Sequence, residues 1–243
     1  NAAKEGGHNT LWQDTVAQQN FVGLWMKLSD SLHTYPVDMV AYELLNEAVA
    51  PEHEDWNRLI NKAIAAVREK EPERVLIVGP NMWQIASNLQ YLKLPENDKN
   101  IILSFHTYTP IAFTHYLANW TPAQNYKGPV HYPGQIITNE DYMKYVDTSD
   151  VALVKEIADS REYFDKQRLI EVFRSGIEYA GTKNLQLYCG EFGCLPTVER
   201  IDRLQYYSDL ISAFEENNIA WCNWEYKGDF GIYFFDLEKK VSL

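Results

Sequence analysis

The chain has 243 residues, 46% of them hydrophobic, so it can bury the core of one large domain. Its formal net charge of −12 disfavours nucleic acid and anionic membranes as partners and is compatible with a neutral polysaccharide. No signal peptide or transmembrane run is visible, so we expect an extracellular protein if a signal peptide precedes residue 1 and a cytoplasmic one otherwise.

Apolar residues recur at helical spacing in several stretches, and apolar runs typical of buried strands follow them. We expect helices within residues 9–33, 56–67, 169–177 and 201–214. We expect strands at residues 39–45, 74–78, 100–105, 185–190 and 219–224.

Strands that are apolar along their whole length and alternate with amphipathic helices predict a parallel sheet covered on both faces. That pattern fits a (β/α) barrel or an open doubly wound sheet. No Gly-x-Gly-x-x-Gly follows a predicted strand and no Walker sequence occurs, so nucleotide-binding open sheets lose support. Polar and aromatic residues instead collect where strands end, which is the rim on which a barrel builds its active site.

Two glutamates stand at such strand ends. Glu47 closes the run Tyr42-Glu43-Leu44-Leu45-Asn46-Glu47, and Glu191 lies in Cys189-Gly190-Glu191-Phe192-Gly193. Retaining glycoside hydrolysis uses two carboxyl groups about 5–5.5 Å apart, one acidic and one nucleophilic. The alternative is that each is an ordinary surface acid at the end of a strand.

The chain resembles glycoside hydrolase family 5, the large cellulase-like group of retaining enzymes, and looks closest to β-glucanases with a subdomain inserted after the sixth strand. Four motifs in the family order carry this resemblance: Leu45-Asn46-Glu47, His106-Thr107-Tyr108, Cys189-Gly190-Glu191-Phe192-Gly193 and Trp224. Asn9-Thr10-Leu11-Trp12 also resembles the stretch that follows the family's third strand.

The resemblance implies a role for each matched residue. Glu191 would be the nucleophile, with Tyr108 donating a hydrogen bond to it, and Glu47 would be the acid and later the base. Asn46 would hold the sugar 2-hydroxyl.

His106 and Trp224 would shape the sugar subsite at the point of cleavage. Alternatively, His106 is a hydrogen-bonded core histidine and Trp224 packs without touching substrate. No metal or other cofactor is expected, because the histidines show no His-x-x-x-His or Cys-His spacing.

Residues 109–164 are too many for an ordinary βα loop and predict a subdomain inserted into the catalytic domain that spans residues 1–243. Its aromatic residues either form a small core or place Trp120 or Tyr132 over the cleft, stacked on a sugar ring. Trp83, just after a predicted strand, has a stronger claim to that stacking role by position.

The resemblance begins after the family's third strand, so we expect strands 4–8 of a (β/α)8 TIM barrel here. Either the sequence is part of a longer protein that supplies the first strands, or partner chains fill the gap, or the fold is rebuilt. Glu43 has the same strand parity as Glu47, points into the barrel and needs a hydrogen-bond donor or a cation.

The sequence therefore predicts a retaining endo-β-1,4-glucanase, or cellulase, that acts on β-glucan, including mixed-linkage glucan. Two alternatives stay open: a carbohydrate-binding or inactive barrel fragment, and the same chemistry on mannan or xylan.

Overall fold

The computed structural model describes residues 10–231, so Asn9 of the family-like N-terminal stretch lies outside the described part. The chain forms two compact units. Unit 1 comprises Asn1–His106 with Ser175–Tyr188, and unit 2 comprises Thr107–Arg174 with Cys189–Leu243. Helix α6 (Lys166–Lys183) and strand β6 (Gln186–Phe192) therefore each contribute to both units.

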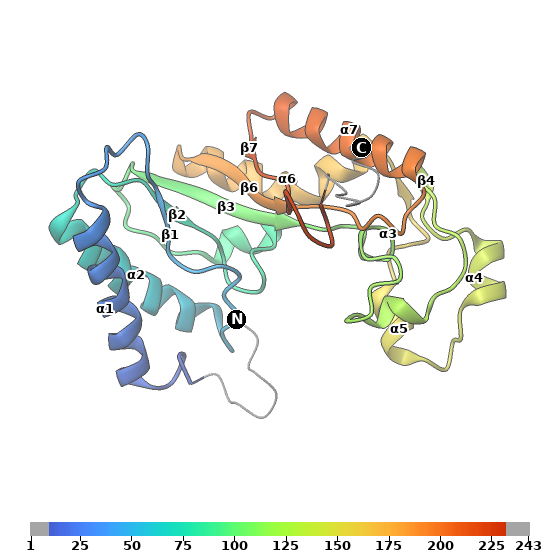
Figure 1. The fold of residues 1–243 in the computed structure, drawn as a ribbon, viewed down its shortest axis with the longest axis horizontal. Helices are drawn as coiled ribbons and strands as arrows, with labels where there is room; N and C mark the ends of the chain where they lie inside the picture. Colours follow the sequence, from blue (N-terminus) through green and yellow to red (C-terminus); the bar gives the residue numbers. More distant parts are fainter. Residues whose placement is uncertain (1–9, 232–243) are drawn as a thin grey trace, which may run out of the picture. The chain divides into compact units, whose positions relative to one another are not determined.

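Unit 1 is built around parallel strands. Its elements are α1 (Thr15–Leu32), β1 (Tyr42–Glu43), α2 (His53–Lys70), β2 (Leu76–Val78), the 3-10 helix η1 (Ala86–Tyr91), β3 (Ile101–Thr107) up to His106, and parts of α6 and β6. The strands lie in the order β1-β2-β3-β6, and the β1–β2 and β2–β3 pairs are parallel (Figure 1). The alternation of helices and parallel strands predicted from the sequence is thus present.

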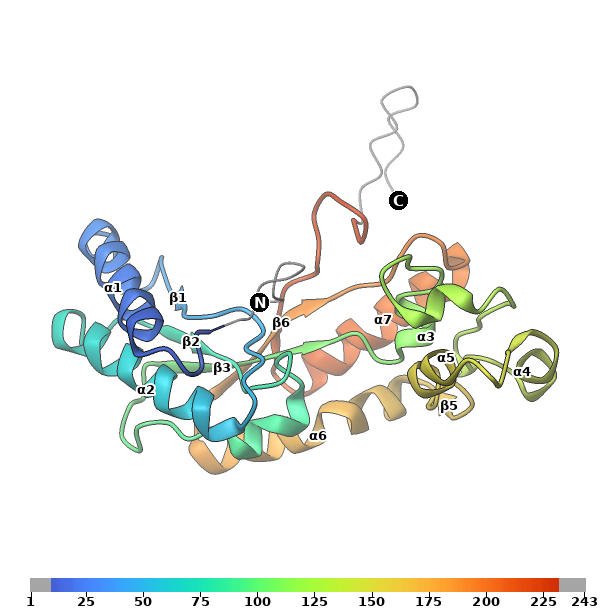
Figure 2. The same ribbon diagram turned by 90° about the horizontal axis from the view of Figure 1, so that it is seen from below.

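The two faces of this sheet are buried to different extents. Tyr42, Leu76 and Ile101 lie side by side in the strand register and are buried. Helix α2 and the end of α6 lie along one side of the strands (Figure 2). On the opposite face Glu43 and Ile77, which are also register neighbours, are only half-buried. Within the described residues, the expectation of a sheet covered on both faces therefore holds for one face only.

Helix α2 forms where its apolar stripe predicted it. Glu52 and Asp55 make a reciprocal capping box at its N-terminus, which satisfies backbone N–H groups that have no partner inside the helix. The helix buries its apolar stripe almost completely: Trp56, Leu59, Ile60, Ala63, Ile64 and Val67. Burial of this stripe holds α2 against the rest of unit 1.

Helix α1 is present, and its predicted apolar stripe is covered only in part. Asp14 caps the helix through the Val16 N–H at 2.8 Å. Helix α1 lies beside α2, and its stripe divides into exposed residues, Val16, Leu24 and Leu28, and half-buried ones, Phe21, Trp25 and Leu32. Spacing alone identified the helix correctly but not which residues of its stripe are covered.

Unit 2 contains mostly short elements. They are α3 (Ile111–Thr114), the 3-10 helix η2 (Pro122–Asn125), β4 (Gly134–Gln135), α4 (Asn139–Tyr145), α5 (Val151–Glu156), β5 (Tyr163–Phe164), α7 (Arg200–Glu216), β7 (Ala220–Trp221) and parts of α6 and β6. Strands β4 and β5 pair antiparallel, and the Cys222 N–H donates to the Cys189 oxygen at 2.9 Å beside β7. None of the helices within residues 10–231 is long and apolar enough to cross a membrane.

The aromatic residues of the predicted insertion divide between core and surface. Phe113 and Tyr132 are buried, and the Tyr132 hydroxyl donates to Asp209 Oδ2 at 2.9 Å. Burial raises the pKa of Tyr132 far above its usual value, with the Asp209 hydrogen bond adding to the effect. The stacking role considered for Tyr132 is therefore wrong, since its ring lies in the core. Trp120 is 54% exposed and stays a candidate.

Candidate active site

Unit 1 contains the first predicted catalytic residue, paired with a histidine. Glu47 follows β1, and its Oε1 lies 2.9 Å from Nδ1 of His106 near the end of β3. The Glu47 side chain is 29% exposed, whereas that of His106 is 3% exposed. The pair thus presents a reachable carboxyl group supported by a buried imidazole.

The loops that follow β1 and β2 are joined by hydrogen bonds. The Asn81 side chain accepts from the Ala50 N–H at 2.7 Å and donates to the Ala50 oxygen at 3.0 Å. The Met82 N–H donates to the Ala48 oxygen at 2.8 Å. The loop that carries Glu47 is therefore anchored from the next strand along the sheet.

The structure also supplies the donor that Glu43 requires. Gln84 Nε2 donates to Glu43 Oε1 at 3.3 Å and to Ser104 Oγ at 3.0 Å. Neither Gln84 nor Ser104 was recognised in the sequence. The one local signal is Gly79, because a side chain there would collide with Gln84.

Unit 2 contains the second glutamate with a hydroxyl partner. Glu191 lies in β6, and the Tyr108 hydroxyl donates to its Oε2 at 2.9 Å. The Tyr108 ring meets Phe230 edge-on, and the Tyr108 carbonyl oxygen accepts from Thr114 Oγ1 at 2.5 Å. The hydroxyl is thus held in place at both the ring and the backbone. A carboxylate that accepts such a hydrogen bond is favoured in its ionised form.

A cysteine supports the backbone at Glu191 without being reactive. Burial raises the pKa of Cys189 well above its usual value, so its sulfur stays protonated. That S–H donates to the Glu191 carbonyl oxygen at 3.3 Å. Cys189 is therefore a core thiol in this strand.

The remaining predicted binding residues lie at exposed positions. Asn46 is exposed directly before Glu47, and Trp83 is 54% exposed after β2. In unit 2 the centre of the Trp120 ring lies 6.3 Å from that of the Phe230 ring. The backbone N–H of Trp224 donates to the backbone oxygen of Phe192 at 2.8 Å. Unit 1 thus holds Asn46, Glu47, Trp83 and His106, and unit 2 holds Tyr108, Trp120, Glu191 and Trp224.

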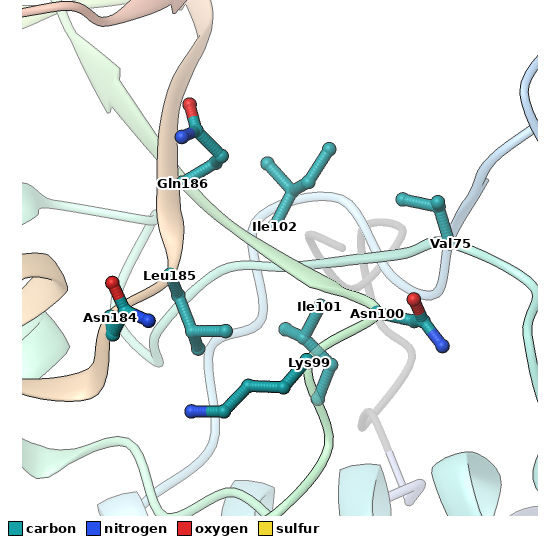
Figure 3. Close-up of a pocket in the computed structure, with 8 residues that line it drawn as sticks. All are labelled: Val75, Lys99, Asn100, Ile101, Ile102, Asn184, Leu185 and Gln186. Atoms are coloured by element: carbon teal, nitrogen blue, oxygen red, sulfur yellow. The ribbon is translucent and has the colours of Figure 1, made fainter.

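A separate hollow of about 200 Å³ lies at the opposite end of the unit 1 strands. Figure 3 shows the residues that line it: Val75, Lys99, Asn100, Ile101, Ile102, Asn184, Leu185 and Gln186. They mark the amino ends of β2, β3 and β6, whereas Glu47 and His106 lie near or after carboxyl ends. No carboxyl group lines the hollow, so it cannot supply the acid/base pair.

Fold and site together define a class of protein. The fold is α/β, with parallel strands of the TIM-barrel type and glutamates placed where strands end. The chain matches the family "Cellulase (glycosyl hydrolase family 5)" over residues 5–229. It belongs to glycosyl hydrolase family 5.

Individual relatives agree with that assignment. Endoglucanase C of Acetivibrio thermocellus is 34% identical over 236 residues, which cover 96% of this chain and 67% of the relative. Cellodextrinase A of Ruminococcus flavefaciens is 28% identical over 84% of this chain and 52% of its own length. The chain is a glycosyl hydrolase that spans part of the length of these relatives.

A solved structure shows the same fold. The endoglucanase Cel5A of the hyperthermophile Thermotoga maritima superposes with a TM-score of 0.76 at 25% identity, over 97% of this chain and 67% of that one. Cel5A has also been crystallised with cellobiose and with mannotriose.

Proposed function

We propose that this chain is the catalytic part of an endo-β-1,4-glucanase that cleaves β-glucan with retention of configuration. The observation that carries the proposal is the pair of strand-end glutamates, each hydrogen-bonded through its carboxyl group, in a chain 34% identical to an endoglucanase. Retention requires the two carboxyl groups about 5–5.5 Å apart in the working enzyme.

The contacts support different roles for the two glutamates. Glu191 accepts from the Tyr108 hydroxyl, which favours the ionised form that attacks the anomeric carbon. Glu47 contacts His106. An imidazole nitrogen can donate to an ionised carboxylate or accept from a protonated carboxyl group, so the contact suits a group that gains and loses a proton. Glu47 is therefore the proposed acid that protonates the leaving oxygen and the base that later activates water.

Sugar binding is the role we propose for exposed residues in each unit. Asn46 next to Glu47 is the proposed partner of the 2-hydroxyl, and the Trp83, Trp120 and Trp224 rings offer flat apolar surfaces for glucosyl units. Mannan is a second candidate substrate, because Cel5A of T. maritima has been crystallised with mannotriose.

Azide rescue of two variants tests the proposal in the full-length protein. Glu191→Ala removes the nucleophile, so release of reducing sugar from barley β-glucan should collapse, and azide should give a glycosyl azide of inverted configuration. Glu47→Ala should lose about 10²–10⁴-fold on the same glucan. With an activated aryl cellobioside, azide should then give the retained anomer.

The exposed Glu96 provides a matched control, since Glu96→Ala removes a carboxyl group from a surface loop. It should keep wild-type activity. If Glu47→Ala and Glu191→Ala also kept it, the assignment of both residues would be wrong, and exchanged anomers would exchange the roles. Binding of β-glucan by the wild type without release of reducing sugar would favour the carbohydrate-binding alternative.

A further inference from the structure

Gln84 is a buried amide inside an unusual piece of backbone. Gln84 directly follows Trp83 and is only 1% exposed. Met82, Trp83 and Gln84 have φ values of 63°, 57° and 55°, so three consecutive residues other than glycine adopt the left-handed conformation. Such conformations are costly and are retained where the surroundings enforce them, often at functional sites.

Both ends of the Gln84 amide are occupied, and the partners fix its orientation. Its NH₂ group donates to Glu43 Oε1 and Ser104 Oγ. Because an ionised carboxylate only accepts hydrogen bonds, the nitrogen of the amide faces Glu43. The amide oxygen then faces Glu47, and it accepts from the Glu47 backbone N–H at 2.7 Å.

Glu47 itself depends on that hydrogen bond for its conformation. Its φ of 48° is left-handed, a conformation that residues other than glycine rarely adopt. The bond from its N–H to Gln84 holds the backbone in this conformation, from which the side chain reaches His106.

Gln84 also holds the partner of Glu47. The backbone N–H of His106 donates to the Gln84 carbonyl oxygen at 2.9 Å. The backbones of Glu47 and His106 are therefore both fixed to one residue, and their side chains meet at 2.9 Å. This closed set of contacts sets where the Glu47 carboxyl group lies.

We propose that Gln84 is a positioning residue for the acid/base carboxyl group of Glu47. The inference rests on the proposed function of Glu47 and adds the residue through which the sheet orients that side chain. Gln84 touches neither substrate nor the reacting atoms in this role. It acts by holding the Glu47 N–H and the His106 N–H at the same time.

Gly79 makes room for this arrangement. A Cβ at position 79 would lie 2.3 Å from Gln84 Cγ and 2.5 Å from its Cδ and Nε2. Gly79→Ala therefore displaces the amide without changing its chemistry, and it provides a second route to the same defect.

The dependence on leaving group separates positioning from general destabilisation. We compare kcat/KM on cellooligosaccharides, whose leaving alcohols need protonation, with kcat/KM on dinitrophenyl β-cellobioside, whose leaving group does not. Gln84→Met and Gly79→Ala should lose about 10- to 100-fold on the first substrate and less than about threefold on the second. Asn57→Leu is the matched control, because it removes another buried amide of unit 1, one that donates to the Tyr91 oxygen and not to the loop that carries Glu47. Its losses should be equal on both substrates.

A glutamate in place of Gln84 adds a pH readout. The ionisable groups around it are Glu43, Glu47 and His106. In Gln84→Glu the protonated acid reproduces both the acceptor and the donor of the amide. Burial and the Glu43 carboxylate raise the pKa of the introduced group. The ratio of variant to wild-type activity should therefore fall as pH rises, whereas the ratio for Gln84→Met should not change with pH.

Glu47→Gln distinguishes the two ways of failing. Thermal unfolding first shows whether the Gln84→Met variant is folded. If Glu47→Gln shows the leaving-group dependence and the folded Gln84→Met variant does not, the positioning role is wrong. If Glu47→Gln itself loses nothing on cellooligosaccharides, the proposed function of Glu47 is wrong. Equal losses of Gln84→Met on both substrates would likewise overturn the positioning role.

Discussion

Backbone conformation at Glu47 shows how a single residue can be adapted to a role at the expense of stability. A left-handed residue other than glycine is disfavoured by contact between its Cβ and the following carbonyl. Glu47 adopts this conformation and its N–H is held by Gln84. The side chain carries the chemistry, so glycine, which would relieve the strain, is not usable there.

Two substitutions that both remove the carboxyl group measure this strain. The free energy of unfolding of Glu47→Gly should exceed that of Glu47→Ala by about 0.5–1 kcal/mol. The glycine variant is the more stable one because only alanine keeps a Cβ in the left-handed region. Urea unfolding of the two variants checks it. The neighbouring Ala48 does not adopt the left-handed conformation, so Ala48→Gly should instead destabilise the protein. A glycine variant at position 47 no more stable than the alanine variant would contradict the strain argument.

A buried ionic network joins three elements of unit 1. Glu71, at the end of α2, accepts from Ser29 of α1 at 2.6 Å, from Tyr42 of β1 at 2.9 Å and from Arg74 at 2.8 Å. Arg74 also donates to the Val40 carbonyl oxygen at 2.7 Å. The network therefore fixes α1, α2 and the approach to β1 to one another.

The same contacts shift two pKa values in opposite directions. Burial acts to raise the pKa of Glu71, but the hydrogen bonds from Ser29, Arg74 and Tyr42 outweigh it and hold that pKa below its usual value. Burial, together with the hydrogen bond to Glu71, raises the pKa of Tyr42 to about 12. Folding thus favours the ionised glutamate and the neutral tyrosine.

These directions predict how stability depends on pH. Because the folded pKa of Glu71 is depressed, its contribution is complete above its unfolded pKa of about 4.3 and is lost as pH falls through the folded value. Glu71→Gln should cost about 3–5 kcal/mol at neutral pH, since Arg74 stays buried without its carboxylate partner. Below a pH of about 4.3, the unfolding free energy of Glu71→Gln should also depend less on pH than that of the wild type.

Urea unfolding across acidic pH measures both effects. Glu69→Gln, on an exposed position of the same helix, is the control and should follow the wild type. A Glu71→Gln variant with wild-type stability and wild-type acid dependence would show that the network contributes nothing.

At the scale of the whole polypeptide, the half-buried face of the unit 1 sheet requires explanation. Parallel sheets are ordinarily covered on both faces. Glu43, Ile77 and Ile102 occupy one face of β1, β2 and β3 in register and are only partly covered by the described residues. In a TIM barrel this face is the interior, which is filled by side chains from all eight strands.

We therefore propose that the functional protein includes strands preceding residue 1 that close the barrel over this face. Mass spectrometry of the protein purified from its source should give a mass above the 28.2 kDa of this sequence. A protein of 28.2 kDa that is monomeric and unfolds in one cooperative transition would contradict the proposal.

The sequence by itself determined the longer helices and the strands of the parallel sheet, and it singled out two glutamates as candidates. Period-3.6 stripes located α2 and α7, and the strand-end motifs located Glu47 and Glu191, because both signals are local in the chain. Element lengths were less accurate: the strand expected at 39–45 is Tyr42–Glu43, and that expected at 219–224 is Ala220–Trp221.

Only the tertiary structure decided which residues support the site. Gln84 is 37 positions from Glu47 and 20 from Ser104, so its contacts with both depend on how distant segments fold together. The same is true of the partly exposed stripe on α1, because helical spacing gives periodicity but not which residues find a neighbour. Local pattern fixes what each segment becomes, and packing between distant segments fixes which side chains meet.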